Sequence, residues 1–259
     1  MLDYAFTIAD LEYYLLILTR ISCFIFVSPF FGMTNTPARV KVGISFFVSV
    51  MLYYTLPKDY PIYIGIFGYA IVVLKEAATG MVIGIGAQIC ISIASFAGRL
   101  IDMEVGLSMV NQMDPTTKEN ATITGVFYKN IIMIILIITG MYQYLLKAIA
   151  ESFELIPING AVFRYESMVE NIVIFTRDFT IIGFRICLPV LAAIIILNTV
   201  LGVLAKVAPQ LNMFAVGIQL KIIIGLIVVY LSTTLLVQNT SIIFEEMKRM
   251  VVLFVKSLM

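Results

Sequence analysis

Residues 77–98 read AATGMVIGIGAQICISIASFAG, a run of 22 residues without Asp, Glu, Lys or Arg. Residues 222–244, IIIGLIVVYLSTTLLVQNTSIIF, form a second such run of 23 residues. About 20 apolar residues suffice to cross a bilayer as a helix, because the hydrocarbon core is ~30 Å thick. Backbone in lipid must satisfy its own hydrogen bonds, and continuous runs of this length do so as helices. The sequence therefore predicts an all-α, polytopic membrane protein with long bent helices and helical hairpins.

The composition of the whole chain supports this prediction and excludes other classes. Of 259 residues, 61% are hydrophobic and 13% are charged, whereas soluble domains are roughly half apolar and about a quarter charged. The net charge is +1, so nucleic-acid binding has no electrostatic basis. The chain has no histidine, which removes Ser-His-Asp triads and most zinc sites. We therefore expect no enzyme activity, no cofactor and no metal site.

Turn residues divide the chain into apolar helices and polar loops. We expect one membrane-embedded unit over residues 1–259, in which a helix containing Arg20 can cross the membrane only if that residue faces protein or a cavity. The helices are predicted at about 12–31, 39–57, 62–74, 77–100, 121–146, 168–204 and 214–257. The loops are predicted at 32–38, 106–120, 151–165 and 206–213.

Lys75 and Glu76 interrupt the otherwise apolar stretch 60–98. A single helix over that stretch is too long for one crossing, so the pair could form the solvated tip of a helical hairpin. Alternatively, ionisable groups at membrane depth indicate a functional site. Of these two readings, we favour the hairpin tip.

Three glycines, Gly80, Gly84 and Gly98, lie in the same apolar stretch. Small residues near every fourth position allow helix backbones to approach closely, which is how helices commonly associate in membranes. The sequence predicts a tight helix–helix contact at these glycines. It does not distinguish a contact between subunits from one within the chain.

A charged cluster follows this apolar run, at Arg99, Asp102 and Glu104. Charges at such a boundary usually mark the interface with water. If the cluster is instead buried in an assembly, its members must be paired and hydrogen-bonded. Arg99 and Asp102 are three residues apart, a spacing that favours an ion pair on one helical face.

The most distinctive polar stretch is 106–115, GLSMVNQMDP. It begins with a flexible glycine, ends with Asp-Pro, and carries the apolar residues Leu107, Met109, Val110 and Met113. Methionine is unbranched and adaptable, which suits a seal that must later open. An ordinary surface loop would carry fewer apolar residues.

With these residues in view, the chain resembles the flagellar biosynthetic protein FliR family and its injectisome counterparts over nearly its whole length. The matching motifs are Pro29-Phe30-Phe31-Gly32 with Pro37; Gly80, Gly84 and Gly98; Asp102 with Gly106-Leu107-Ser108 and Asp114-Pro115; Ser152-Phe153 with Pro157; Pro189 with Leu191; and Pro209-Gln210-Leu211-Asn212-Met213-Phe214 followed by Gly217 and Lys221.

The resemblance implies a core subunit of the type III protein export gate in the bacterial inner membrane, within the flagellar basal body. It implies one copy in a complex with the flagellar P and Q membrane proteins, contacts with the flagellar B and A export proteins, and passage of unfolded export substrates. It also implies that a loop pointing into the lumen helps to close the pore. The residues of that loop here are Leu107, Met109, Val110, Asn111, Gln112 and Met113.

Two departures from the family pattern and two rival functions remain. Relatives often carry aromatic side chains in the loop and a histidine after the position of Gly140, where this chain has Met141.

A stand-alone transporter or channel would need a midplane site of broken helices or paired charges, for which Lys75, Glu76 and Arg185 are the candidates. An intramembrane enzyme is disfavoured by the missing histidines.

Overall fold

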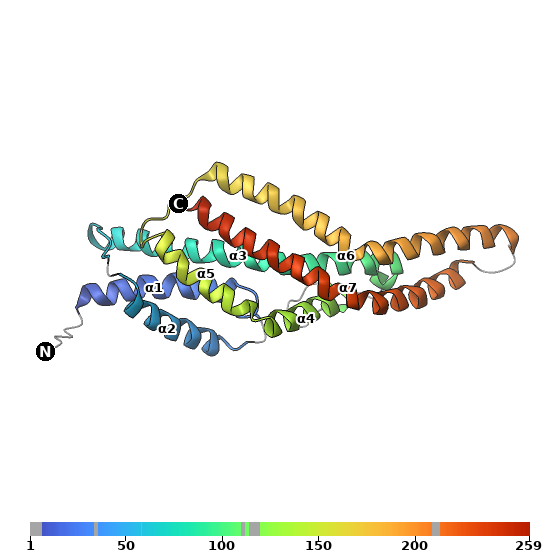
Figure 1. Ribbon diagram of the computed structural model, residues 1–259, viewed down its shortest axis with the longest axis horizontal. Helices are drawn as coiled ribbons and strands as arrows, with labels where there is room; N and C mark the ends of the chain where they lie inside the picture. Colours follow the sequence, from blue (N-terminus) through green and yellow to red (C-terminus); the bar gives the residue numbers. More distant parts are fainter. Residues whose placement is uncertain (1–6, 34–35, 58, 110–111, 114–119, 209–212) are drawn as a thin grey trace. The chain divides into compact units, whose positions relative to one another are not determined.

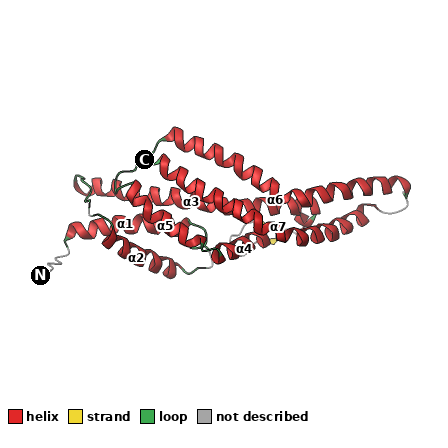
Figure 2. Ribbon diagram, viewed as in Figure 1, coloured by secondary structure: helices red, strands yellow, loops and turns green. Residues whose placement is uncertain are grey.

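The computed structural model describes residues 7–33, 36–57, 59–109, 112–113, 120–208 and 213–259. Helices dominate this part of the chain (Figure 2), which confirms the all-α prediction. The elements in chain order are α1 (Ile8–Val27), α2 (Ala38–Thr55), α3 (Gly65–Val105), the 3-10 helix η1 (Leu107–Met109), β1 (Gln112–Met113), β2 (Asn120–Ala121), α4 (Ile123–Ile138), α5 (Met141–Leu155), α6 (Tyr165–Val207) and α7 (Met213–Ser257).

The chain forms two compact units. Unit 1 comprises residues 1–89, 140–175 and 246–259, and unit 2 comprises residues 90–139 and 176–245.

Three helices are long and apolar enough to cross a membrane, judged by length and composition in the described part of the chain: α3, α6 and the Val216–Ser257 part of α7. The pair α4 and α5, bent by 72°, would make a fourth if it forms one broken span.

Unit 1 begins with α1 and α2, which lie side by side (Figure 1). Thr7 and Asp10 form a capping box that starts α1, since each side chain accepts from the other residue's backbone N–H. The buried face of α2 is polar and carries Lys41, Ser45 and Ser49. Each serine hydroxyl donates to the carbonyl four residues earlier.

The opposite face of α2 is apolar and exposed, and includes Phe47 and Met51 at 69% and 71% exposure. A helix with its apolar side outward is typical of apolar surroundings, either lipid or partner helices.

Residues 60–105 differ from the sequence prediction. One helix, α3, runs through Lys75 and Glu76 without a break, so the predicted helices 62–74 and 77–100 with a hairpin tip between them are wrong. Ala77 and Ala78, which follow the pair directly, are strong helix formers, and no proline lies between Gly65 and Val105 to end the helix. Glu76 is fully buried and therefore does not need the water that a hairpin tip would supply.

Residues 121–146 also differ from the prediction of one helix. α4 and α5 meet at Thr139 and Gly140, with a bend of 72°. Gly140 adopts φ 69°, a left-handed conformation that glycine accepts without strain. α5 then continues to Leu155, five residues into the predicted loop 151–165, and Pro157 follows its end. The predicted break at 206–213 is shorter, because α6 extends to Val207 and α7 begins at Met213.

The three glycines named in the sequence analysis allow close contacts between helices of this chain. A Cβ added at Gly80 would overlap the Arg20 carbonyl oxygen, and one at Gly84 would lie 3.1 Å from the Phe24 carbonyl oxygen. The backbone of α1 therefore rests directly on α3 in unit 1. In unit 2, a Cβ at Gly98 would overlap the backbone of Gly125, so α3 and α4 cross closely there. Of the two readings left open by the sequence, contacts within the chain account for all three glycines.

Candidate functional site

A buried ion pair forms the polar centre of unit 1. Arg20 Nε donates to Glu76 Oε2 at 2.6 Å, and both side chains are fully excluded from solvent. Arg20 comes from α1 and Glu76 from α3. The glycine contact at Gly80, one turn from Glu76, brings the two helices close enough for the side chains to meet. Arg20 therefore meets the condition that the sequence analysis set for its helix, namely that this residue faces protein.

Backbone groups near the end of α5 complete the surroundings of this pair. Arg20 Nη1 donates to the carbonyl oxygens of Ile156 at 2.9 Å and Ser152 at 3.3 Å. The guanidinium carbon lies 4.1 Å from the centre of the Phe153 ring. The backbone N–H of Asn159 donates to Glu76 Oε1 at 2.9 Å. Arg20 and Glu76 therefore join α1, α3 and the segment 152–159.

This arrangement is suited to holding segments together rather than to chemistry. Removing one member of a buried pair leaves an uncompensated charge and costs about 3–5 kcal/mol. Arg20 Nη2 is buried without a hydrogen-bond partner in the described part of the chain. No group of three or more Cys, Asp or Glu able to hold a metal ion occurs among the described residues. The ion pair therefore stabilises the packing of α1, α3 and the segment 152–159. Neither Arg20 nor Glu76 lies in a group of described residues that could hold a metal ion.

A second polar cluster lies at the start of α1. Asp10 Oδ1 accepts from the hydroxyls of Tyr53 at 2.8 Å and Tyr60 at 2.7 Å. Hydrogen bonds from the Thr7 side chain, and then from Tyr60 and Tyr53, hold the pKa of Asp10 well below its usual range. The hydroxyl of Tyr63 donates to Glu12, and this bond raises the pKa of Tyr63 to about 12.

In unit 2, the three residues of the predicted charged cluster differ in how far they are buried. Asp102 is 1% exposed and accepts from the backbone N–H of Thr124 at 3.0 Å and from its hydroxyl. Asp102 is therefore buried and hydrogen-bonded, and its partner is Thr124 at the start of α4. Arg99 is exposed and Glu104 is half-buried. The prediction that these charges simply mark the water interface is wrong for Asp102.

The predicted pore-closing loop lies between the two segments that Asp102 and Thr124 join. After Gly106, at φ 92°, Leu107 and Met109 lie in the turn η1. Gln112 and Met113 form β1, which pairs antiparallel with β2 so that Gln112 faces Ala121 and Met113 faces Asn120. Val110 and Asn111 lie outside the described residues. The backbone of the loop is thus a turn followed by a short two-stranded pairing.

Comparison with known proteins identifies the family. Residues 11–247 match the family described as Bacterial export proteins, family 1. The chain belongs to this family. Among curated relatives, the flagellar biosynthetic protein FliR of Bacillus subtilis is 30% identical over 246 residues, covering 93% of this chain and 95% of the relative. FliR of Aquifex aeolicus is 27% identical over 241 residues and covers 92% of each chain. FliR of Escherichia coli is 24% identical over 213 residues, or 81% and 79% of the two chains.

Membership of the FliR family makes the chain a component of the flagellar export apparatus. Its long apolar helices are those of a membrane-embedded component.

Sequence reasoning identified some residues of this export protein's buried polar contacts and missed others. It singled out Asp102 and Glu76 but not their partners Thr124 and Asn159. Arg20 was recognised only as a charge that needs a protein environment. A basic residue within an apolar helix and an acidic residue within another are the signal that could have paired Arg20 with Glu76.

Proposed function

We propose that this chain is a core subunit of the type III protein export gate and that residues 106–113 help to close its pore. The supporting observation is the Asp102–Thr124 contact, which fixes the end of α3 to the start of α4 and so holds both stems of the loop. The close approach of Gly98 and Gly125 one turn away reinforces this anchor. A loop on fixed stems can occupy one defined place in a pore.

The loop's apolar residues suit the role of a seal. Leu107, Met109 and Met113 present flexible or branched apolar side chains in a segment flanked by polar residues. Such side chains exclude water and ions when packed together, and methionine adapts to irregular neighbours. No catalytic step is needed, since the energy for transport would come from other components of the apparatus.

The proposed partners are those that the resemblance to the family implies. We propose that one copy of this chain assembles with several copies of the flagellar P and Q membrane proteins in the inner membrane of the basal body. The flagellar B and A export proteins would bind the same assembly, and unfolded flagellar subunits would pass through it. The exposed apolar faces of α6 and α7, which include Ile195 and Tyr230, provide surfaces that lipid or P and Q helices could cover.

A stand-alone transporter or channel is the second candidate, and the buried Arg20–Glu76 pair is the observation that favours it. Co-expression with the P and Q proteins, followed by detergent extraction and mass determination, separates the two. The export-gate proposal predicts one copy of this chain in a large complex with P and Q. A stable monomer or homo-oligomer, with P and Q eluting elsewhere, would favour the transporter.

A further inference from the structure

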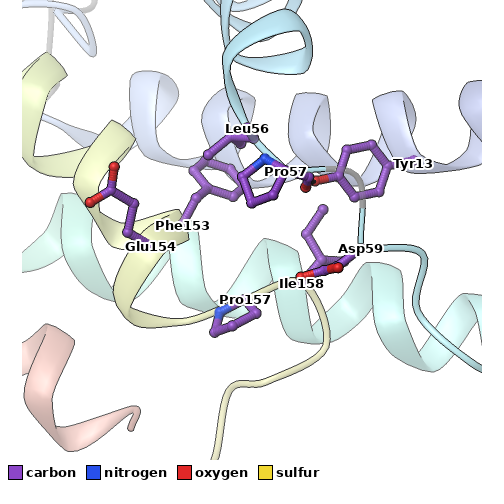
Figure 3. Close-up of a pocket in the computed structure, with 8 residues that line it drawn as sticks. All are labelled: Tyr13, Leu56, Pro57, Asp59, Phe153, Glu154, Pro157 and Ile158. Carbon is purple, nitrogen blue, oxygen red and sulfur yellow. Dashed lines mark hydrogen bonds between the residues drawn. The ribbon is translucent and has the colours of Figure 1, made fainter.

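A pocket of about 260 Å³ opens on unit 1 between the ends of two helices (Figure 3). α2 ends at Thr55 and is followed by Pro57, and α5 ends at Leu155 and is followed by Pro157. Both prolines line the pocket, as do the rings of Tyr13 and Phe153. Its volume falls below the ~300–1,000 Å³ of ordinary cofactor and drug pockets. The space therefore suits a single side chain rather than a whole cofactor.

The electrostatic surroundings of this pocket are negative. Two of its lining residues are carboxylates, Asp59 and Glu154, which lie apart on the two sides of Pro157 in Figure 3. Both are exposed, and neither side chain makes a hydrogen bond or ion pair within the part of the chain that the structure describes. The C-terminal end of a helix adds partial negative charge. α2 has no basic residue in its last turn to offset that charge, whereas the terminal carbonyls of α5 accept hydrogen bonds from Arg20.

Arg20 does not neutralise the pocket. It donates to two carbonyls near the end of α5 from the buried side, but its charge is matched by Glu76 at 2.6 Å. The proximity of Asp59 also contributes to a raised pKa of Tyr13, after the larger effect of burial. Among the described residues that line the pocket, the charged ones are Asp59 and Glu154, and these two carboxylates favour a cation.

The segment that follows Asp59 along the chain carries exposed apolar side chains. Ile62, Ile64 and Phe67, which follow Asp59 along the chain, are 94%, 92% and 88% exposed. Exposed apolar side chains close in sequence to a small charged pocket are typical of a site for another polypeptide. The stem of a lysine or arginine is apolar and packs on rings and prolines, while its charged end seeks carboxylates.

We propose that this pocket receives a lysine or arginine side chain from another polypeptide, with its stem on Phe153 and Pro157 and its charge between Asp59 and Glu154. The assignment does not depend on pore closure by residues 106–113. It gives unit 1 a docking point for a basic partner segment whose neighbouring residues are apolar.

The test uses a photocrosslinking amino acid in place of Ile158, which lines the pocket, in the full chain in living cells. The same substitution at the exposed Ile195 of unit 2 is the control for crosslinking competence. Mass spectrometry of the crosslinked peptide should find a lysine or arginine at or next to the linked residue of another polypeptide. Ethylguanidinium should suppress the crosslink, whereas the neutral ethylurea should not.

The variant Asp59→Asn/Glu154→Gln should lower the crosslink yield about tenfold or more, as expected for the loss of charge-assisted hydrogen bonds. Both side chains are exposed, so an unchanged thermal unfolding midpoint will show that folding is intact. A charge exchange, in which Asp59→Lys is combined with an acidic substitution of the basic partner residue, should restore the crosslink yield. Crosslinks to lipid, to this same chain or to a segment without a basic residue would overturn the proposal. An unchanged yield in the double variant would overturn it too.

Discussion

Arg20 Nε and Glu76 Oε2 lie 2.6 Å apart, although 56 positions separate the two residues along the chain. The pair joins α1 to α3, and Arg20 extends the connection to the carbonyls of Ser152 and Ile156. Three segments distant in sequence thus meet at one buried charge pair in unit 1. Breaking it should affect the whole unit rather than one helix.

The first prediction concerns Glu76. The variant Glu76→Ala leaves the fully buried Arg20 guanidinium without its counter-charge, so we expect a loss of about 3–5 kcal/mol of stability. Thermal unfolding in detergent, followed by circular dichroism, should show a markedly lower midpoint. The matched control is Glu151→Ala, which removes an exposed ion pair with Lys147 and should cost about 0–1 kcal/mol.

The double variant Arg20→Leu/Glu76→Leu tests whether the loss of stability comes from an unpaired buried charge or from the loss of side-chain volume. Because replacing both charges by apolar groups leaves no unpaired charge, it should unfold at a higher temperature than Glu76→Ala. A midpoint as low as that of Glu76→Ala would show that an unpaired buried charge is not the source of the effect.

The second prediction concerns the contact between α1 and α3. Gly80→Ala places a Cβ against the Arg20 carbonyl oxygen, so we expect overpacking to cost about 1–3 kcal/mol. Gly43→Ala in α2 meets nothing within 4 Å and should instead gain up to about 1 kcal/mol from helix propensity. Opposite shifts in the two thermal midpoints would support this packing, and two upward shifts would contradict it.

The sequence was sufficient to predict an all-α membrane protein because its long uncharged runs leave helices as the only solution in lipid. It failed at Lys75 and Glu76 because segment length alone suggested a break, whereas a partner 56 positions away removed the need for one. Local periodicity contains no information on such a distant partner. Asp102 was singled out from the sequence as one of three charges that usually mark the interface with water, but its burial and its contact with Thr124 depend on the Gly98–Gly125 crossing, which only the folded chain reveals.

The third prediction concerns pH. The hydrogen bond to Glu12 raises the pKa of Tyr63 from 10.0 to about 12. A raised folded pKa means that the bond contributes stability below pH 10 and that this contribution is lost as the pH rises toward 12. The difference in ultraviolet absorbance between this chain and Tyr63→Phe should therefore titrate near 12. In the Glu12→Gln background the midpoint should fall toward 10, and an unchanged midpoint would exclude Glu12 as the cause.

The fourth prediction concerns the stems of the loop. Asp102→Ala leaves the Thr124 backbone N–H without its buried acceptor, a loss of about 1–3 kcal/mol. We expect reduced secretion of flagellar subunits and weaker hydrogen-exchange protection at the start of α4. Glu104→Ala, two residues away and half-buried, is the control and should change neither. Equal effects of the two variants would mean that the anchor has no special role.

The most direct test is the ion conductance of the complex with the flagellar P and Q proteins in planar bilayers. The double variant Met109→Gly/Met113→Gly removes apolar volume from the segment 106–113, and Met259→Gly at the exposed C-terminus is its control. If this segment closes the pore, the loop variant should leak ions several-fold more than the unaltered complex, and the control should not. Unchanged conductance in an intact complex would contradict closure by these residues.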